Sequence, residues 1–371
     1  MPVAHQIMSS SIDCEVWRRA TTAGYGQQPK VPFIATMISL QLRHKDGLWP
    51  HGLALCYGVL GYACGLTMMM TTGAIVNLLG TLLLAHAMVI SAYLIHECAH
   101  NTIFAANSRN ARLGACLSWI TGSCYARYED LRRKHFRHHV ERADVIGFDY
   151  RRRIPAHPSL ARWMAALEWA HIPAVEIMLH ALVVLLPFSD DRYKSCRRRV
   201  VSVLLLRATL FTVLGLVSPR ALLLYAVAYM LFLIVLRFMD ANQHTYDLVE
   251  LHNDLPLPDD VARNRDYEYR NTYSNPISMR FPLLNLLTLN FAYHNAHHDR
   301  PTVPWYRLPA LHHQLYGDDR RHVLSFRELL RAYHKYRVKR AFRPLPCDEK
   351  FHVGRGPDFN GIDGISFLIP I

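Results

Sequence analysis

The chain has 371 residues, of which 51% are hydrophobic and 19% charged, and its formal net charge is +13. The apolar residues gather in long runs with the charges between them, which excludes an intrinsically disordered chain and argues against a soluble two-domain enzyme. An excess of Lys and Arg suits nucleic acid, an acidic substrate or an anionic membrane surface, and the apolar runs favour the membrane over nucleic acid. The eight cysteines include no C-x-x-C pair, so we expect reduced thiols.

The N-terminal half begins with a polar segment, residues 1–47, which has no apolar stretch behind a basic start. We therefore expect no cleaved secretory signal and a cytoplasmic N-terminal segment. An almost uncharged stretch follows, interrupted by the turn-forming Met70-Thr71-Thr72-Gly73. It predicts two transmembrane helices, over about 53–70 and 74–95, joined as a hairpin whose two ends lie on one side of the membrane.

The middle of the chain holds two less regular apolar segments and a second hairpin. Residues 103–124 and 160–187 are apolar but interrupted by charges, which predicts interfacial helices, with a re-entrant hairpin as the alternative for the second. Transmembrane helices are predicted over about 200–217 and 221–238. Arg207 lies near enough to a helix end for its side chain to snorkel to the interface.

Basic runs mark the loops between the apolar segments. They are Arg132-Arg133-Lys134, Arg151-Arg152-Arg153 and Arg197-Arg198-Arg199. By the positive-inside rule these loops, and hence both termini, face the cytoplasm. We expect an all-α integral membrane domain over 48–345, with a cytoplasmic helical cap over 241–345. The segment 346–371 is predicted to be a tail, flexible from Phe351 onward.

Three histidine-rich strings stand out among the 22 histidines. They are His96-Glu97-Cys98-Ala99-His100, His135-Phe136-Arg137-His138-His139 and His294-Asn295-Ala296-His297-His298. Positions i, i+3 and i+4 share one face of a helix, so each string aims two or three imidazoles at one point. The H-x-x-H-H pattern occurs twice, which chance does not explain. The spacing is that of metal ligands.

The predicted topology places all three strings at the cytoplasmic face, where they can converge. His244 falls just past the second hairpin at the same level, and Asp240 precedes it by one helical turn. Nine imidazoles exceed the ligands that one metal takes, so we predict two metals. The predicted ligands are His96, His100, His135, His138, His139, His244, His294, His297 and His298. Iron, zinc and copper all bind imidazole. A metal centre beside a membrane is expected to act on an apolar substrate, which favours redox chemistry with dioxygen and therefore iron.

Some residues outside or beside the ligand positions are not expected to bind metal, and two other classes of metal-binding membrane protein fit the sequence less well. Six histidines lack such neighbours and are expected to be packing, interfacial or surface residues: His86, His171, His180, His312, His313 and His334. Glu97 is expected to accept a hydrogen bond from an imidazole rather than to bind metal. A zinc hydrolase needs only one metal, and a metal transporter places its ligands at the bilayer midplane, so both alternatives fit less well.

The three strings, at these separations and with paired hydrophobic hairpins, resemble the integral-membrane fatty acid desaturases over roughly 50–310. The local context agrees: Asn101 follows the first string, Asp144 the second, and Asp299-Arg300-Pro301 the third. The resemblance implies that the eight histidines of the strings ligate two non-haem irons and that His244 is the extra ligand. Relatives that act on acyl-CoA carry an asparagine at the position of Asp240, where it holds a metal-bound water. We therefore predict a catalytic role for Asp240, with a hydrogen bond to a ligand imidazole or Arg237 as the alternative.

The resemblance also implies an activity and its partners. A desaturase introduces a C=C bond into a fatty acyl chain carried on lipid, CoA or a carrier protein, using dioxygen and two external electrons. No H-P-G-G string of a fused haem domain occurs here, so a separate ferredoxin-like or cytochrome-type donor is expected to dock on the basic cytoplasmic face. Acetylenases and hydroxylases share the same strings, and these activities remain open.

Overall fold

The computed structural model describes residues 41–246, 249–251, 263–342 and 368–369. The described part is predominantly helical, as predicted, and its strands form one small pair. Most of the predicted N-terminal segment and most of the predicted tail lie outside the described residues.

Among the described residues, four helices are long and apolar enough to cross a membrane, which confirms the prediction of about four such helices. They are α2 (Leu48–Met69), α3 (Ala74–Ala99), α9 (Arg197–Val217) and α10 (Pro219–Asp240). Ser218 separates α9 from α10, and its side chain accepts a hydrogen bond from the backbone N–H of Ala221. A serine N-cap followed by proline at the first helical position is a strong helix start, so α10 begins one residue after α9 ends.

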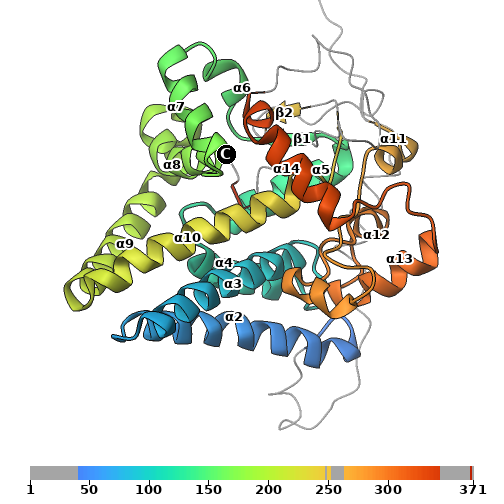
Figure 1. The fold of residues 1–371 in the computed structure, drawn as a ribbon, viewed down its shortest axis with the longest axis horizontal. Helices are drawn as coiled ribbons and strands as arrows, with labels where there is room; N and C mark the ends of the chain where they lie inside the picture. The colour runs from blue at the N-terminus through green and yellow to red at the C-terminus, as the bar shows by residue number, and fades with distance from the viewer. Residues whose placement is uncertain (1–40, 247–248, 252–262, 343–367, 370–371) are drawn as a thin grey trace, which may run out of the picture. The chain divides into compact units, whose positions relative to one another are not determined.

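Two glycines allow α2 and α3 to pack with their backbones in close approach (Figure 1). A Cβ atom built on Gly65 would lie 2.8 Å from the carbonyl oxygen of Gly80, and one built on Gly80 would lie 2.9 Å from that of Gly65. Small residues at a helix interface are the usual means of close packing between apolar helices. This pair fixes α3 beside α2.

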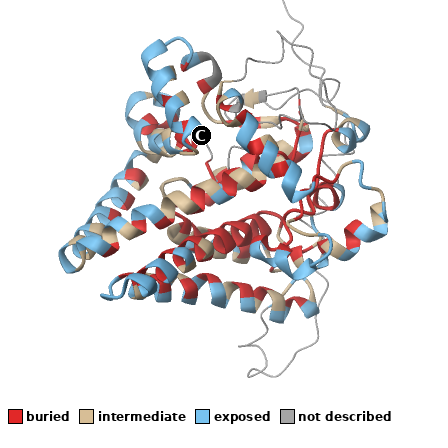
Figure 2. Ribbon diagram, in the orientation of Figure 1, coloured by how far each residue is buried: buried red, intermediate tan, exposed pale blue. Residues whose placement is uncertain are grey.

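The apolar helices differ greatly in burial (Figure 2). In the most apolar window of α3, 72% of the residues are buried, compared with 11% for α9. The outward apolar face of α9 is what a lipid-facing helix requires, whereas α3 is at the centre of the helical assembly. Arg207 on α9 does not snorkel as predicted: its side chain is buried and donates to the carbonyl oxygen of Trp119 at 3.2 Å. The guanidinium group therefore has a hydrogen-bond acceptor inside the protein and does not need to extend to the membrane interface.

Shorter elements surround the four helices. They are α4 (Asn107–Thr121), α5 (Tyr128–Glu141), α6 (Tyr150–Arg153), α7 (Pro158–Trp169), α8 (Ala174–Ser189), α11 (Arg265–Arg270), α12 (His294–Asp299), α13 (Leu308–Tyr316) and α14 (Phe326–Ala341), with 3-10 turns η2 (Lys45–Gly47), η3 (Ser123–Tyr125), η4 (Asp191–Cys196), η5 (Pro282–Thr288) and η6 (Trp305–Arg307). Strand β1 (Asp144–Ile146) pairs in parallel with β2 (Val249–Leu251), with Asp144 opposite Val249. Each strand has three residues, too short for a sequence pattern to predict.

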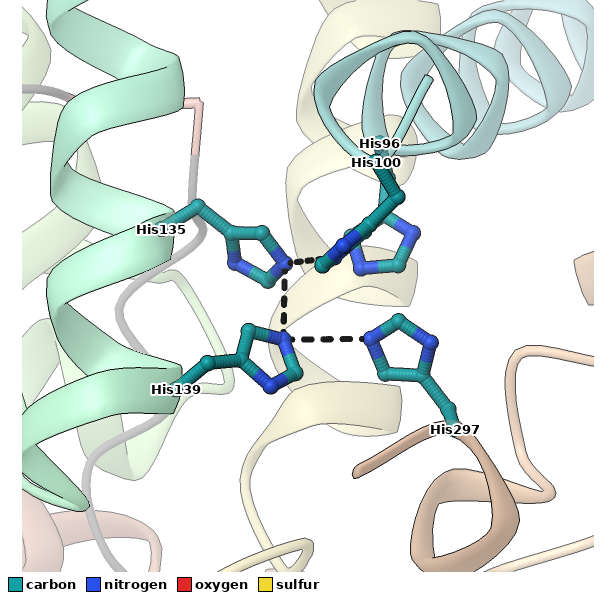
Figure 3. A group of neighbouring side chains, drawn as sticks. All are labelled: His96, His100, His135, His139 and His297. Carbon is teal, nitrogen blue, oxygen red and sulfur yellow. Dashed lines mark hydrogen bonds between the residues drawn. The ribbon is translucent and has the colours of Figure 1, made fainter. Parts of the chain in front are cut away.

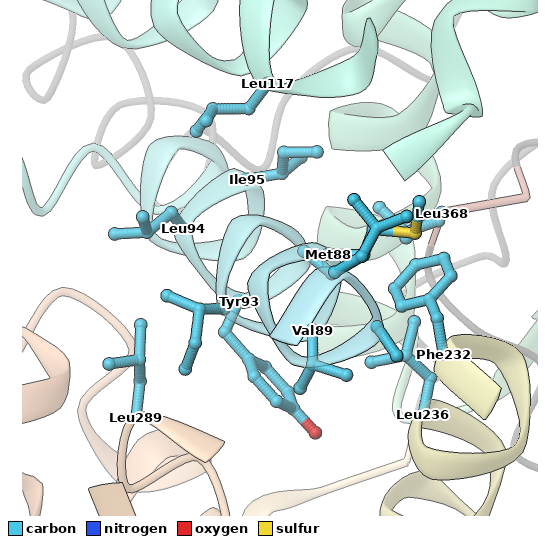
Figure 4. Close-up of a cluster of buried hydrophobic side chains, with 14 of the residues drawn as sticks. Met88, Val89, Tyr93, Leu94, Ile95, Leu117, Phe232, Leu236, Leu289 and Leu368 are labelled. Carbon is cyan, nitrogen blue, oxygen red and sulfur yellow. The ribbon is translucent and has the colours of Figure 1, made fainter. Parts of the chain in front are cut away.

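The largest hydrophobic core surrounds α3 (Figure 4). Met88, Val89 and Tyr93 of α3 pack there with Phe232 and Leu236 of α10. A second core is built mainly from α7, α8 and the segment around β1. The first core holds the end of α3, and with it the first histidine string, in a fixed position.

Two residues of the predicted tail are buried. Leu368 and Ile369 are 2% and 0% exposed, and they belong to the first and second core respectively. Apolar side chains this deeply buried are held by packing against their neighbours. The composition of the surrounding sequence did not indicate this burial.

Candidate metal centre

One group of five imidazoles lies where α3, α5 and α12 meet (Figure 3). Its members are His96, His100, His135, His139 and His297. The two histidines at the end of α3 and the two on α5 are each four residues apart, so they project from one face of their helix. All five side chains are buried.

The ring nitrogens of this group face one another at short range. The Nε2 atom of His135 lies 2.6 Å from Nε2 of His100 and 3.1 Å from Nε2 of His139. The Nε2 atom of His297 lies 3.2 Å from that of His139. The nitrogens therefore surround one point rather than pairing in rows.

A second group of four imidazoles adjoins the first. Its members are His138, His244, His294 and His298. The Nε2 atom of His244 lies 2.7 Å from Nε2 of His294 and 3.0 Å from Nε2 of His138. The rings of His139 and His298 stack across the boundary with their centroids 4.2 Å apart. Neighbouring residues of α5, His138 and His139, thus belong to different groups.

The donor set fits metal cations. The ring N–H at Nδ1 of His138 donates to the carbonyl oxygen of Ala143 at 2.9 Å, and that of His298 donates to Oε1 of Glu268 at 2.9 Å. A neutral imidazole that donates from Nδ1 carries its lone pair on Nε2. Nε2 of His298 is buried and has no hydrogen-bond partner among the described residues. Lone pairs that converge without protons between them repel unless a cation lies among them, so each group fits one metal.

The protonation state suits the same role. Burial lowers the pKa of His138 to about 4 and that of His297 to about 3, with a smaller contribution from neighbouring imidazoles to the second. Burial also lowers the pKa values of His100, His139 and His298 well below the usual value, as do the adjacent imidazoles. These rings are neutral at pH 7, which is the state that binds metal.

Glu268 of α11 is a functional candidate that the sequence did not indicate. Its Oε1 accepts from His298, and its Oε2 accepts from Nε of Arg142 at 3.0 Å. Burial raises the pKa of this carboxyl group, and Arg142 opposes that shift. A carboxylate that accepts from a ligating imidazole orients the ring and raises its basicity. No motif surrounds Glu268, so only the folded chain places it beside His298.

Glu97 differs from its prediction. Its Oε2 accepts from Oγ1 of Thr102 at 2.6 Å and from the backbone N–H of Trp305 at 3.1 Å. Its Oε1 lies 4.0 Å from Nδ1 of His96, which is longer than a hydrogen bond. The side chain therefore ties the loop after α3 to η6 rather than orienting an imidazole.

Asp240 lies at the end of α10, beside the four-histidine group. It lines a cavity of about 70 Å³ together with Lys134, His135, His138, Asp144, Val145, Gln243, His244, Phe291 and His294. Its Oδ1 is buried and has no hydrogen-bond partner among the described residues. Arg237, three residues earlier on α10, donates hydrogen bonds to Glu168 and Glu176.

Six further histidines, those predicted to be packing, interfacial or surface residues, lie outside both groups. His86 contacts Tyr57, with its Nδ1 2.6 Å from the hydroxyl oxygen, and the rings of His171 and His334 stack on each other. His180, His312 and His313 are likewise absent from the two groups. The nine predicted ligands are thus brought together and the six other histidines are kept apart.

In the described part of the chain, four apolar helices of membrane-spanning length and two adjoining groups of largely buried imidazoles define a helical membrane protein with a candidate two-metal centre. The family model for fatty acid desaturases matches residues 73–330, and the chain therefore belongs to the fatty acid desaturase family. Membership implies an oxidoreductase of the desaturase, hydroxylase or acetylenase type that uses iron and dioxygen. No curated protein matches the chain.

Proposed function

We propose that the protein is an oxygen-dependent membrane fatty acyl desaturase with two non-haem irons. The observation that carries the proposal is the division of nine neutral imidazoles, eight of them buried, into adjoining groups of five and four. The five-histidine group would hold one iron and the four-histidine group the other. Hydrolases with two metals also exist, so membership of the fatty acid desaturase family is what favours redox chemistry at these two groups.

A C–H bond in a saturated chain is too strong for side-chain acid–base chemistry, and the two irons with dioxygen and two external electrons would supply the oxidising power. The protein's residues position and protect that centre. Ala143 and Glu268 fix the rings of His138 and His298 through their Nδ1 protons. Phe291, whose ring centroid is 4.9 Å from that of His96 and 5.1 Å from that of His294, provides an apolar wall beside both groups.

Asp240 is proposed as a catalytic residue of the four-histidine group. Four imidazoles leave room in the coordination shell of an iron, and the unpartnered Oδ1 of Asp240 borders the same cavity as His244 and His294. The carboxylate would reach the second iron directly or through a water. An anionic ligand there would stabilise the ferric state relative to the neutral amide that some relatives carry.

For the membrane arrangement we propose two transmembrane hairpins, α2 with α3 and α9 with α10. The domain would extend over 48–345, with residues 241–345 as a cytoplasmic cap and 346–371 as a C-terminal tail. The basic runs beside the helices would place both termini and the metal centre on the cytoplasmic side. Cysteine labelling at sites engineered near Gln27 and Asp348 should react from one face of the membrane, and labelling from opposite faces would contradict this topology.

The substrate would be an acyl chain on lipid, CoA or a carrier protein, and a ferredoxin-like or cytochrome-type donor would deliver the electrons. The test is to express the chain with a ferredoxin system and to measure the host's fatty acids by mass spectrometry together with the iron content of the purified protein. A new double bond and close to two irons per chain are expected. A triple bond or a hydroxyl group would instead identify an acetylenase or hydroxylase, and full activity with zinc alone would exclude the di-iron proposal.

A further inference from the structure

The short segment before the third histidine string exposes a large apolar surface. Among the described residues of 241–342, nine large apolar side chains are exposed, and six of them lie within residues 279–287. The six are those of Met279, Phe281 and the four leucines of η5, of which Leu283 is the most exposed at 78%. The segment packs against α3 and is orange in Figure 1. A contiguous apolar patch of this kind marks contact with a partner or a membrane.

The polar groups of this segment turn inward and pair with one another. Asn285 is fully buried, and its amide group donates to the carbonyl oxygen of Ser278 at 2.8 Å and accepts from the backbone N–H of Ser278 at 3.1 Å. The hydroxyl oxygen of Ser278 accepts from the backbone N–H of Phe281 at 2.9 Å, and the hydroxyl of Thr288 donates to the carbonyl oxygen of Asn285 at 3.3 Å. Polar groups are costly beside hydrocarbon unless protein groups pair with them, and these pairs meet that requirement.

A chain of hydrogen bonds joins η5 to both helices of the first predicted hairpin. The carbonyl oxygen of Leu287 lies 3.0 Å from Nε2 of His86 on α3 and can only accept, so Nε2 carries the proton. The Nδ1 atom of the neutral His86 ring then accepts from the hydroxyl of Tyr57 on α2 at 2.6 Å. Tyr57 lies four residues inside the predicted span 53–70, which is about 6 Å of helix. The η5 segment is therefore linked to parts of α2 and α3 that are predicted to be in the membrane.

The face of α2 that bears Tyr57 is itself apolar and exposed. Leu53, Tyr57 and Leu60 follow the i, i+4, i+7 spacing of one helix face, and all three are exposed. Because α2 is a candidate membrane span, this stripe faces lipid. Arg280 marks the edge of the η5 segment, with its guanidinium 5.2 Å from the ring centre of Phe281. A cation beside an apolar patch suits the level of the lipid headgroups.

We propose that residues 279–287 insert into the membrane leaflet on the side of the metal centre, with the leucines of η5 among the upper acyl methylenes and Arg280 at the headgroups. The depth is that of an interfacial element, about 5–10 Å. The proposed cap then rests on the bilayer through η5, and the string that begins at His294 follows this contact in the chain. The inference concerns the bilayer alone and holds for any reaction of the metal centre.

The test uses the purified full chain in phosphatidylcholine vesicles that contain a phospholipid with a diazirine in the upper part of its acyl chain. After illumination, mass spectrometry of peptides locates the crosslinked residues. Leu283→Asp is compared with Leu330→Asp, a matched control at an exposed leucine of α14. Crosslinks on α9, where Leu205 is exposed, serve as the reference within each sample. Thermal unfolding reports on the fold of each variant.

In the unaltered protein, crosslinks are expected on 281–287 with a yield similar to that on α9 and not on the peptide that contains Leu330. A carboxylate is strongly disfavoured in hydrocarbon, so Leu283→Asp should lower the crosslinking of 281–287 about tenfold relative to α9. Leu330→Asp should leave it unchanged. Both variants alter exposed side chains, so their unfolding temperatures should match that of the unaltered protein.

Crosslinks on α9 without crosslinks on 281–287 in the unaltered protein would overturn the inference. Hydroxyl-radical oxidation of the same vesicles then identifies what covers the segment: oxidation as strong as at Leu330 would mean water, and protection without lipid crosslinks would mean a second copy of the chain. Equal crosslinking of 281–287 in Leu283→Asp would also contradict the inference, because the probe would then reach the segment without its insertion. The measurements on the unaltered protein decide the matter if Leu283→Asp does not fold.

Discussion

The two histidine groups differ in what surrounds them. The five-histidine group takes all its members from three helices, and each side chain is at most 9% exposed. The four-histidine group includes the partly exposed His138, contacts Glu268 through His298, and borders the cavity that Asp240 lines. Five neutral nitrogens nearly complete a coordination shell, whereas four leave an open position. If each group holds one iron, as proposed, the first would mainly retain its metal and the second would have room for a further ligand.

The strongest test of this comparison removes a ligand from the closed group. His139→Ala takes away a nitrogen at the boundary, where its ring also stacks on His298, so both metals should be affected. Nearly complete loss of iron and of product is expected, measured by elemental mass spectrometry and fatty-acid profiling. His313→Ala, at an exposed histidine outside both groups, should match the unaltered protein. Full iron content in His139→Ala would contradict the five-ligand assignment.

Asp240→Asn tests the open position of the second group. The change keeps the shape of the side chain but removes its charge, so turnover should fall by about 100-fold, accompanied by partial loss of iron. Asp130→Asn, which removes an acidic charge from a pair with Arg127 on α5, is the matched control and should have little effect. Near-normal turnover and iron in Asp240→Asn would show that the charge has no role and that the asparagine-bearing relatives are functionally equivalent here.

Glu268→Gln tests whether the carboxylate that contacts the four-histidine group contributes to metal affinity. The amide is a weaker acceptor for the Nδ1 proton of His298, so metal affinity should fall about 10-fold, within the range found when such carboxylates are replaced. Chelator competition measures this affinity. Glu97→Gln is the matched control, because Glu97 hydrogen-bonds to Thr102 and Trp305 rather than to an imidazole. An equal loss in both variants would remove the distinction between these carboxylates.

Thr272→Val should have the smallest effect. The hydroxyl of Thr272 lies 3.4 Å from Nδ1 of His244, a long contact that orients the ring weakly. Metal affinity is expected to change by no more than about threefold, since a weak hydrogen bond contributes about 0.5 kcal/mol. The same chelator competition applies. A loss as large as that of Glu268→Gln would mean that His244 depends on this hydroxyl for its orientation.

The sequence alone determined the four long apolar helices of this protein and the convergence of the histidines within each string. Apolar runs of about 20 residues predicted the four long helices, because length and composition suffice for that inference. The i, i+3, i+4 spacing predicted that the histidines of each string converge, since it depends only on helix geometry. That neighbours such as His138 and His139 point in directions about 100° apart also follows from the helical repeat.

Only the tertiary structure decided which elements meet. It divided the nine histidines into groups of five and four, placed Glu268 against His298, and directed Arg207 inward to a carbonyl. It also buried Leu368 and Ile369 between two cores, where the sequence predicted a flexible tail. Helical spacing reports contacts within one element, whereas these contacts join residues far apart in the chain, and their partners are set by the packing of whole helices against one another.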